Sequence, residues 1–162
     1  MFCWYLGGAV FAIWNVFQTN GLDVRLLALG GLAPVLVDAP FGGMEYGHTL
    51  LVPAALLAAV MLATTGRGRR LARRRLLSLP IGWLAGLAFS GAFAHAHVFW
   101  WPAFGGDFGR VALLPPALWV VVLELLGIVA LRWCWVRFGL RDPERRADLV
   151  RHGRVVAERG WT

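Results

Sequence analysis

At 162 residues, with 59% hydrophobic residues and a mean hydropathy of +0.63, the chain carries more apolar surface than a soluble domain of this size buries. Its net charge of +7 is concentrated in the segment 67–75 and beyond Arg132. This clustering excludes a nucleic-acid footprint spread along the chain, and it favours anionic lipid headgroups as the partner. Composition therefore predicts an integral membrane protein.

Apolar segments predict an all-α fold, a polytopic transmembrane bundle of about five spans. In chain order they are Phe2–Phe17, Leu26–Ala39, His48–Thr65, Leu79–Trp100 and Val111–Val136. Each approaches the roughly 20 residues that cross a bilayer except the second, which is short and contains Pro34. That segment is interpreted either as a tilted span or as a re-entrant hairpin. The hairpin alternative leaves four spans.

The arginine run between the third and fourth segments predicts the orientation. Short loops rich in arginine stay on the cytoplasmic side of a membrane. With this loop inside, five spans place the N-terminus outside and the C-terminal tail inside, and Arg110 is the single arginine outside. We therefore expect a multi-pass protein of the cell membrane, with a transmembrane domain over 1–138 and a basic cytoplasmic tail over 139–162.

A short polar helix is predicted within the tail. Asp142 is a good N-cap residue, and Pro143 suits the first helical position.

Candidate metal ligands gather on the predicted outer face. Asp38 ends the second segment and His48 opens the third, so a short loop can bring a carboxylate and an imidazole together. This pair suits Zn²⁺, Mn²⁺ or Fe²⁺. The alternative is structural: Asp38 caps or forms a salt bridge at the interface, and His48 hydrogen-bonds at a helix start.

Small residues form a stripe on the fourth segment. Gly82, Gly86 and Ser90 recur every four residues, which is typical of closely packed membrane helices. If the helix continues at about 100° per residue, His97 lies on this stripe and His95 faces away. His97 is therefore the third metal-ligand candidate, or else an interfacial histidine beside Trp100.

Three acidic residues complete the candidate chemistry. Glu45 and Asp107 lie on the predicted outer face, where either is a candidate catalytic base. Glu124 lies near the centre of the fifth segment, where a carboxylate is costly and indicates either a functional cavity or an interhelical hydrogen bond. Asn15 and Gln18 are its candidate partners. A small transporter built around Glu124 is a further alternative.

Several stretches carry a resemblance to a known family. They are 33–40 with Asp38, His48 at the start of a span, 79–82, 98–102 and 138–145. The chain resembles the YdjM-like family of LexA-regulated inner-membrane proteins, described as metal-dependent hydrolases, and it looks most like versions from high-GC Gram-positive bacteria.

The resemblance implies a metal site that is incomplete in this chain. The family pattern has a Leu-Pro-Asp step, a His at the start of the third span and a His-x-x-x-Asp pair in the fourth. The matching positions here are Val35, His48, Gly86 and Ser90, with Asp38 carried over. Two hypotheses follow: a membrane protein with a degenerate site and little or no catalysis, or a divergent hydrolase whose site is rebuilt from His95 or His97 and Glu45.

Overall fold

The computed structural model describes residues 1–17, 22–66, 68–153 and 155. Across these residues the protein is all-α, and seven α-helices and two short 3₁₀ turns account for its named elements. The helices are α1 (Phe2–Phe17), α2 (Val24–Asp38), α3 (Leu51–Ala63), α4 (Arg70–Ser90), α5 (Ala96–Phe99), α6 (Ala117–Arg137) and α7 (Pro143–His152). The 3₁₀ turns are η1 (Tyr46–His48) and η2 (Ala92–Ala94).

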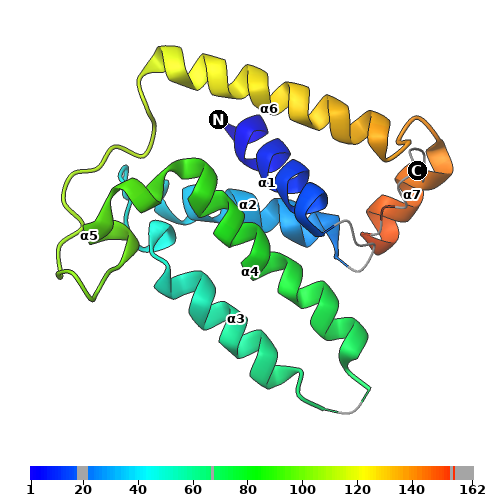
Figure 1. The fold of residues 1–162 in the computed structure, drawn as a ribbon, viewed down its shortest axis with the longest axis horizontal. Helices are drawn as coiled ribbons and strands as arrows, with labels where there is room; N and C mark the ends of the chain where they lie inside the picture. Colours follow the sequence, from blue (N-terminus) through cyan, green and yellow to red (C-terminus); the bar gives the residue numbers. More distant parts are fainter. Residues whose placement is uncertain (18–21, 67, 154, 156–162) are drawn as a thin grey trace.

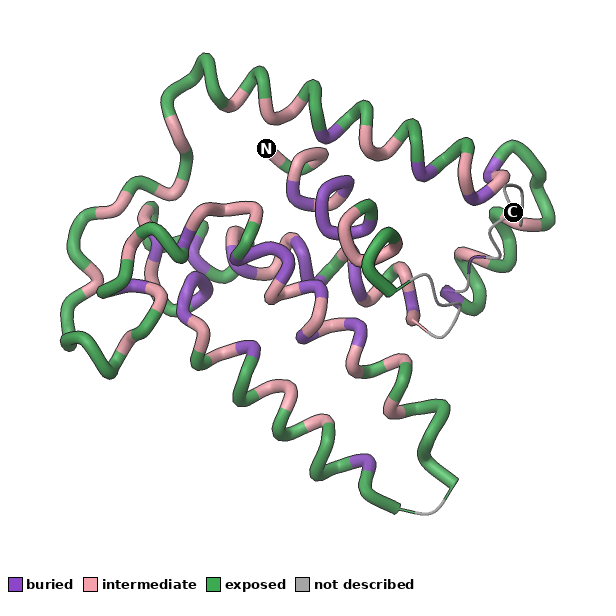
Figure 2. The backbone as a smooth tube through the Cα atoms, viewed as in Figure 1, coloured by how far each residue is buried: buried purple, intermediate pink, exposed green. Residues whose placement is uncertain are grey.

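The helices α1, α2 and α4 form the centre of the molecule, and two apolar helices flank them. The helix α3 packs on α4, whereas α6 packs along α1 on the opposite side (Figure 1). Both flanking helices present mostly exposed residues to the surroundings (Figure 2). Within the described ranges, only α6 is long and apolar enough by itself to cross a membrane, and α1 and α3 are shorter apolar helices.

The contact between α2 and α4 is made backbone to backbone through glycine. A Cβ atom on Gly82 would overlap the carbonyl oxygen of Leu27, and one on Gly86 would overlap that of Gly31. From the other side, Gly30 of α2 lies equally close to the α4 backbone. Two of the three residues in the predicted stripe, Gly82 and Gly86, therefore pack helices as expected.

A second glycine contact, which the sequence analysis missed, joins α1 to α6. A Cβ on Gly7 would lie 2.6 Å from the carbonyl oxygen of Gly127, and one on Gly127 would overlap the α1 backbone near Trp4. This contact holds α6 against α1 although little of α6 is buried.

The prediction of one continuous helix over Leu79–Trp100 was wrong. The helix α4 starts at Arg70, so most of the arginine run is helical, and it ends at Ser90. Gly91 follows with a left-handed backbone (φ +72°), which favours glycine and terminates helices. The Ser90 hydroxyl donates to Leu87 O and accepts from the backbone of Ala92, so Ser90 stabilises this helix end instead of extending the packing stripe.

Two other boundaries differ from the prediction. The helix α2 continues through Pro34 to Asp38 without a break, so the hairpin alternative for residues 26–39 is not present. The last long helix begins at Ala117 rather than at residue 111, because Pro115 and Pro116 precede it and proline favours the first turn of a helix over its interior.

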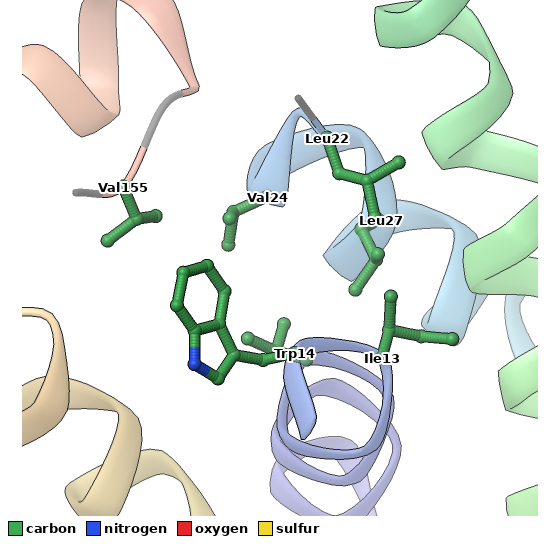
Figure 3. Close-up of a pocket in the computed structure, with 7 residues that line it drawn as sticks. Ile13, Trp14, Leu22, Val24, Leu27 and Val155 are labelled. Carbon is green, nitrogen blue, oxygen red and sulfur yellow. The ribbon is translucent and has the colours of Figure 1, made fainter. Parts of the chain in front are cut away.

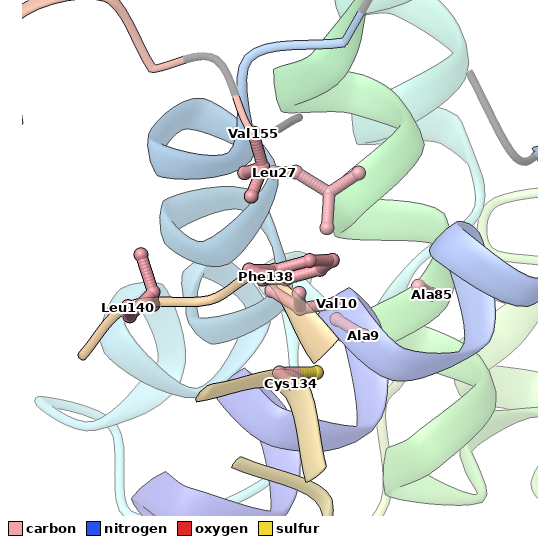
Figure 4. Packing of buried hydrophobic residues seen from close by; sticks show 8 residues of the cluster. All are labelled: Ala9, Val10, Leu27, Ala85, Cys134, Phe138, Leu140 and Val155. Carbon is pink, nitrogen blue, oxygen red and sulfur yellow. The ribbon is translucent and has the colours of Figure 1, made fainter. Parts of the chain in front are cut away.

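The buried apolar cluster lies at the arginine-rich end of the molecule, where the tail folds back. Its members come from α1, α2, α4, the end of α6 and the tail: Ala9, Val10, Leu27, Ala85, Cys134, Phe138, Leu140 and Val155 (Figure 4). The ring of Trp14 packs edge-on against Phe138 at 4.9 Å. The cap predicted for α7 is confirmed, since Asp142 accepts from the backbone of Glu144.

Replacing Gly82 by valine tests the α2–α4 contact. We expect a loss of about 1–3 kcal/mol of folding free energy, because the new side chain must push the two backbones apart. The measurement is thermal unfolding of the purified protein. Gly106→Ala is the matched control, since a Cβ there meets nothing within 4 Å; equal effects of the two substitutions would contradict the packing interpretation.

Candidate functional site

Most charged residues of the described chain lie at one of the two ends of the bundle, and Glu124 within α6 is an exception. One end holds Asp38, η1, α5 and the connection 100–116, and the other holds α7 and the start of α4 (Figure 1). Of the described arginines, only Arg110 belongs to the first end. The predicted candidate site lies at this first end.

Asp38 is a fully buried carboxylate held by three donors. It is the last residue of α2, and the following loop turns back over it. The backbone N–H of Glu45 donates to Oδ2 at 2.7 Å, and that of Gly47 donates to Oδ1 at 2.7 Å. The Nδ1 of His48 donates to Oδ2 at 2.6 Å. These bonds compensate for the burial of the carboxyl group.

His48 is buried as completely as Asp38, with 0% of either side chain exposed. With its Nδ1 hydrogen on the carboxylate, the other ring nitrogen, Nε2, keeps a lone pair in the neutral imidazole. This Nε2 is inaccessible to solvent and has no hydrogen-bond partner among the described residues. The pair therefore has the arrangement of an oriented imidazole, in which the carboxylate fixes the ring and its tautomer.

The loop around this pair is fastened to α4. The indole Nε1 of Trp83 donates to the carbonyl oxygen of Gly47 at 2.9 Å. Gly47 itself packs so closely that a Cβ would lie 2.9 Å from Asp38 Oδ1. The α2–α4 packing thus also fixes the geometry of the Asp38–His48 pair.

The other predicted site residues lie outside this pair. Glu45 contributes its backbone N–H to Asp38, and its side chain is half-buried. His97 is exposed on α5, because the break at Gly91 separates it from the glycine stripe; Asp107 is exposed in the connection to α6. The rings of His95 and His97 pack edge-on at 6.3 Å.

The described residues do not fit the divalent metal ion that the resemblance implies. Nowhere among them do three His, Cys, Asp or Glu side chains gather in a way that could hold a metal ion. His48 offers one free nitrogen, while both oxygens of Asp38 already accept hydrogen bonds. One ligand falls short of the three that a catalytic zinc site uses.

Glu124 contacts main-chain groups of Met1 and of the first turn of α1 rather than a polar side chain of that helix. Its Oε2 lies 3.2 Å from the ammonium group of Met1, and its Oε1 accepts from the N–H of Cys3 at 3.3 Å. Asn15 instead donates to the carbonyl oxygen of Phe11 in its own helix. Gln18, the other candidate partner, lies outside the described residues.

Asp23, which is not among the predicted site residues, is a buried charged residue at the opposite end. Its carboxylate caps α2 through the N–H of Arg25 and pairs with the Arg25 guanidinium at 3.0 Å, while its own N–H donates to Ser78 of α4. Arg25 also donates to Val150 O of α7. An Asp directly before an apolar segment is an N-cap signal that could have identified it.

A small apolar hollow lies beside this polar junction. It is lined by α1, the start of α2 and the tail, with Trp14, Leu27 and Val155 among its walls (Figure 3). Its volume of about 20 Å³ admits at most one water molecule, and Trp14, with its single indole N–H, is the one lining residue that has a polar side-chain group. It is a packing defect rather than a ligand site.

No family model, curated protein or solved structure was found to match this chain. The resemblance to the YdjM-like family therefore stays a prediction.

The pairing of Asp23 predicts a pH dependence of stability. Burial raises the pKa of Asp23, but the hydrogen bonds and charge of Arg25 outweigh it and hold this pKa below its ordinary value of 3.8. A lowered folded-state pKa stabilises the protein above the ordinary value, and the contribution is lost as the pH falls through the lowered pKa. We expect Asp23→Asn to cost about 1–2 kcal/mol at pH 7 and progressively less below pH 3.8.

Denaturant unfolding at pH 7 and at a pH below 3.8 measures this difference in the free energy of unfolding. Asp148→Asn, at an exposed aspartate on α7, is the control and should have little effect at either pH. A deficit of Asp23→Asn that stays constant with pH would contradict the role of its charge.

Proposed function

We propose that the protein is a multi-pass protein of the cytoplasmic membrane whose Asp38–His48 pair has a structural rather than a catalytic role. The observation that carries the membrane assignment is the exposure of α6. Its 21 residues are apolar enough to span, yet only 11% of its most apolar window is buried within the molecule. A core helix of a soluble protein would be mostly covered, so the bilayer is the natural cover.

Apolar exposure on the opposite side of the molecule supports the same assignment. Leu118 and Val129 on α6 are 75% and 66% exposed, and Leu62 on α3 is 74% exposed. The two helices flank the central three, so lipid would surround the bundle (Figure 2). At 1.5 Å per residue, α1 and α3 measure only about 24 and 20 Å, which is short of a 30 Å hydrocarbon core and implies local thinning of the bilayer.

The separation of charge supports the proposed orientation. The arginines of α4 and α7 lie at one end and would face the cytoplasm, where anionic headgroups attract them. The Asp38 end would face outward, with Tyr46, Trp101 and Phe108 in mutual ring contact there. Aromatic residues of this kind favour the membrane interface.

The alternative is a divergent metal-dependent hydrolase acting on a membrane-proximal substrate. The free Nε2 of His48 is the one observation that favours it. A second and third ligand would have to come from exposed residues such as His97, which do not gather around His48 in the described chain. We therefore propose that the role of the pair is to hold the loop 39–48 against the end of α2.

Single cysteines test the proposed topology. In a background with Cys3→Ser and Cys134→Ala, an impermeant thiol reagent should label Asp107→Cys in intact cells. Arg70→Cys should react only after permeabilisation, since the arginine-rich end of the bundle is expected on the cytoplasmic side. The reverse pattern would invert the orientation, and release of the protein by alkaline carbonate would refute the membrane assignment.

Metal content and stability of His48→Ala separate the two roles of the pair. The structural role predicts equal and negligible metal in wild type and variant, measured by elemental analysis. It also predicts a loss of about 3–5 kcal/mol on thermal unfolding, because Asp38 is left buried and short of a donor. Asp107→Asn, at an exposed position, is the control. Near-stoichiometric metal in the wild type that is lost from His48→Ala would favour the hydrolase.

A further inference from the structure

We propose that a cavity at the Asp38 end of the bundle binds one acyl chain of a membrane lipid, a proposal that rests on the membrane assignment above. The cavity has a volume of about 440 Å³. It lies between the start of α1, the end of α4, the segment 111–116 and α6. This volume is within the range of small-molecule sites.

The chemistry of the walls selects an apolar occupant. Phe89, Leu113 and Leu123 are typical of the lining, and the polar side chains among the lining residues are Tyr5, Ser90 and His95. The hydroxyl of Ser90 is already engaged with its own helix end. Ordered water needs two to four polar partners, so a water-filled cavity of this size is disfavoured by such walls.

The packing of α6 explains why the cavity exists and why lipid reaches it. This helix packs along α1 and makes no extended contact with α4, so a gap between α4 and α6 remains at this end. In the proposed bilayer, lipid would cover exposed apolar residues of both helices, such as Ala88, which lines the cavity, and Leu118 near the start of α6. A lipid chain can enter from the side without crossing water.

The segment that closes the cavity is held in place by backbone hydrogen bonding. The N–H of Met44 donates to Val111 O at 3.0 Å, and Gly43 and Ala112 form an antiparallel bridge. Pro115 and Pro116 then lead into α6. The wall is thus a built element of the fold, anchored to the same loop that surrounds Asp38.

The occupant follows from these three observations. The cavity is mostly apolar and opens beside helices that lipid would cover. Its polar groups are the Tyr5 phenol, the His95 imidazole, the Ser90 hydroxyl, which is engaged at its helix end, and the Met1 ammonium, which is paired with Glu124. An acyl chain fills the apolar volume, while His95 and Tyr5 offer hydrogen bonds to the ester oxygens at the head of that chain.

Photolabelling of the full chain in phospholipid nanodiscs tests the proposal. The probe is a phosphatidylglycerol with a diazirine on one acyl chain, and mass spectrometry locates the labelled residues. We expect labelling of Leu113 and Leu123 above the level on the lipid-facing residues of α3. Ala88→Trp fills the cavity from α4, and it should reduce the labelling of Leu113 and Leu123 to the level of the α3 residues.

Ala59→Trp is the matched control, since it places the same side chain on an exposed position of α3. Leu123→Trp narrows the cavity from α6 and is used if Ala88→Trp unfolds, as judged by circular dichroism. The lipid site would be overturned if Leu113 were labelled only to the level of α3, or if neither tryptophan variant lowered its labelling. In either case, membrane association that resists alkaline carbonate would still support the proposed function. Release of the protein by carbonate would overturn both the lipid site and the membrane assignment.

Discussion

The close approach of the α2 and α4 backbones is the constraint on which the rest of the fold depends. Glycine on both helices removes the side chains that would otherwise separate them. In the proposed bilayer there is no hydrophobic driving force between helices, so contact area of this kind would supply much of the association energy. The same contact sets where α3 and the loop 39–48 can lie, since both fasten onto α4.

The Asp38–His48 pair is a polar unit built into this apolar frame. Its three short hydrogen bonds bind the end of α2 to the turn η1 before α3, so that Gly47 and His48 are held in the buried interior. A buried network is stabilising only when its members are satisfied. The unpartnered Nε2 of His48 is therefore a local cost, which the carboxylate and its backbone donors offset.

Local sequence signals predicted much of the fold, but they did not predict which residues contact one another across the chain. The first helix over Phe2–Phe17, the cap at Asp142 and the packing at Gly82 all follow from spacing and residue type. Apolar content alone concealed the end of α4 at Ser90, because the segment beyond Gly91 is as apolar as the helix. The partners of Glu124 are the Met1 ammonium and the N–H of Cys3, which are main-chain groups, and a pattern of side chains carries no information about those.

The same packing leaves no room in this chain for the metal site that the resemblance implies. The family pattern places a His and an Asp four residues apart on the fourth span, at positions that are Gly86 and Ser90 here. Any side chain at Gly86 would meet the carbonyl oxygen of Gly31, so a histidine requires α2 and α4 to separate. Separation would in turn loosen the Trp83 hydrogen bond that holds the loop around Asp38. Close helix packing and a metal-ligating side chain at position 86 therefore exclude each other. In this chain, the α2–α4 contact fills the space that such a metal site would need.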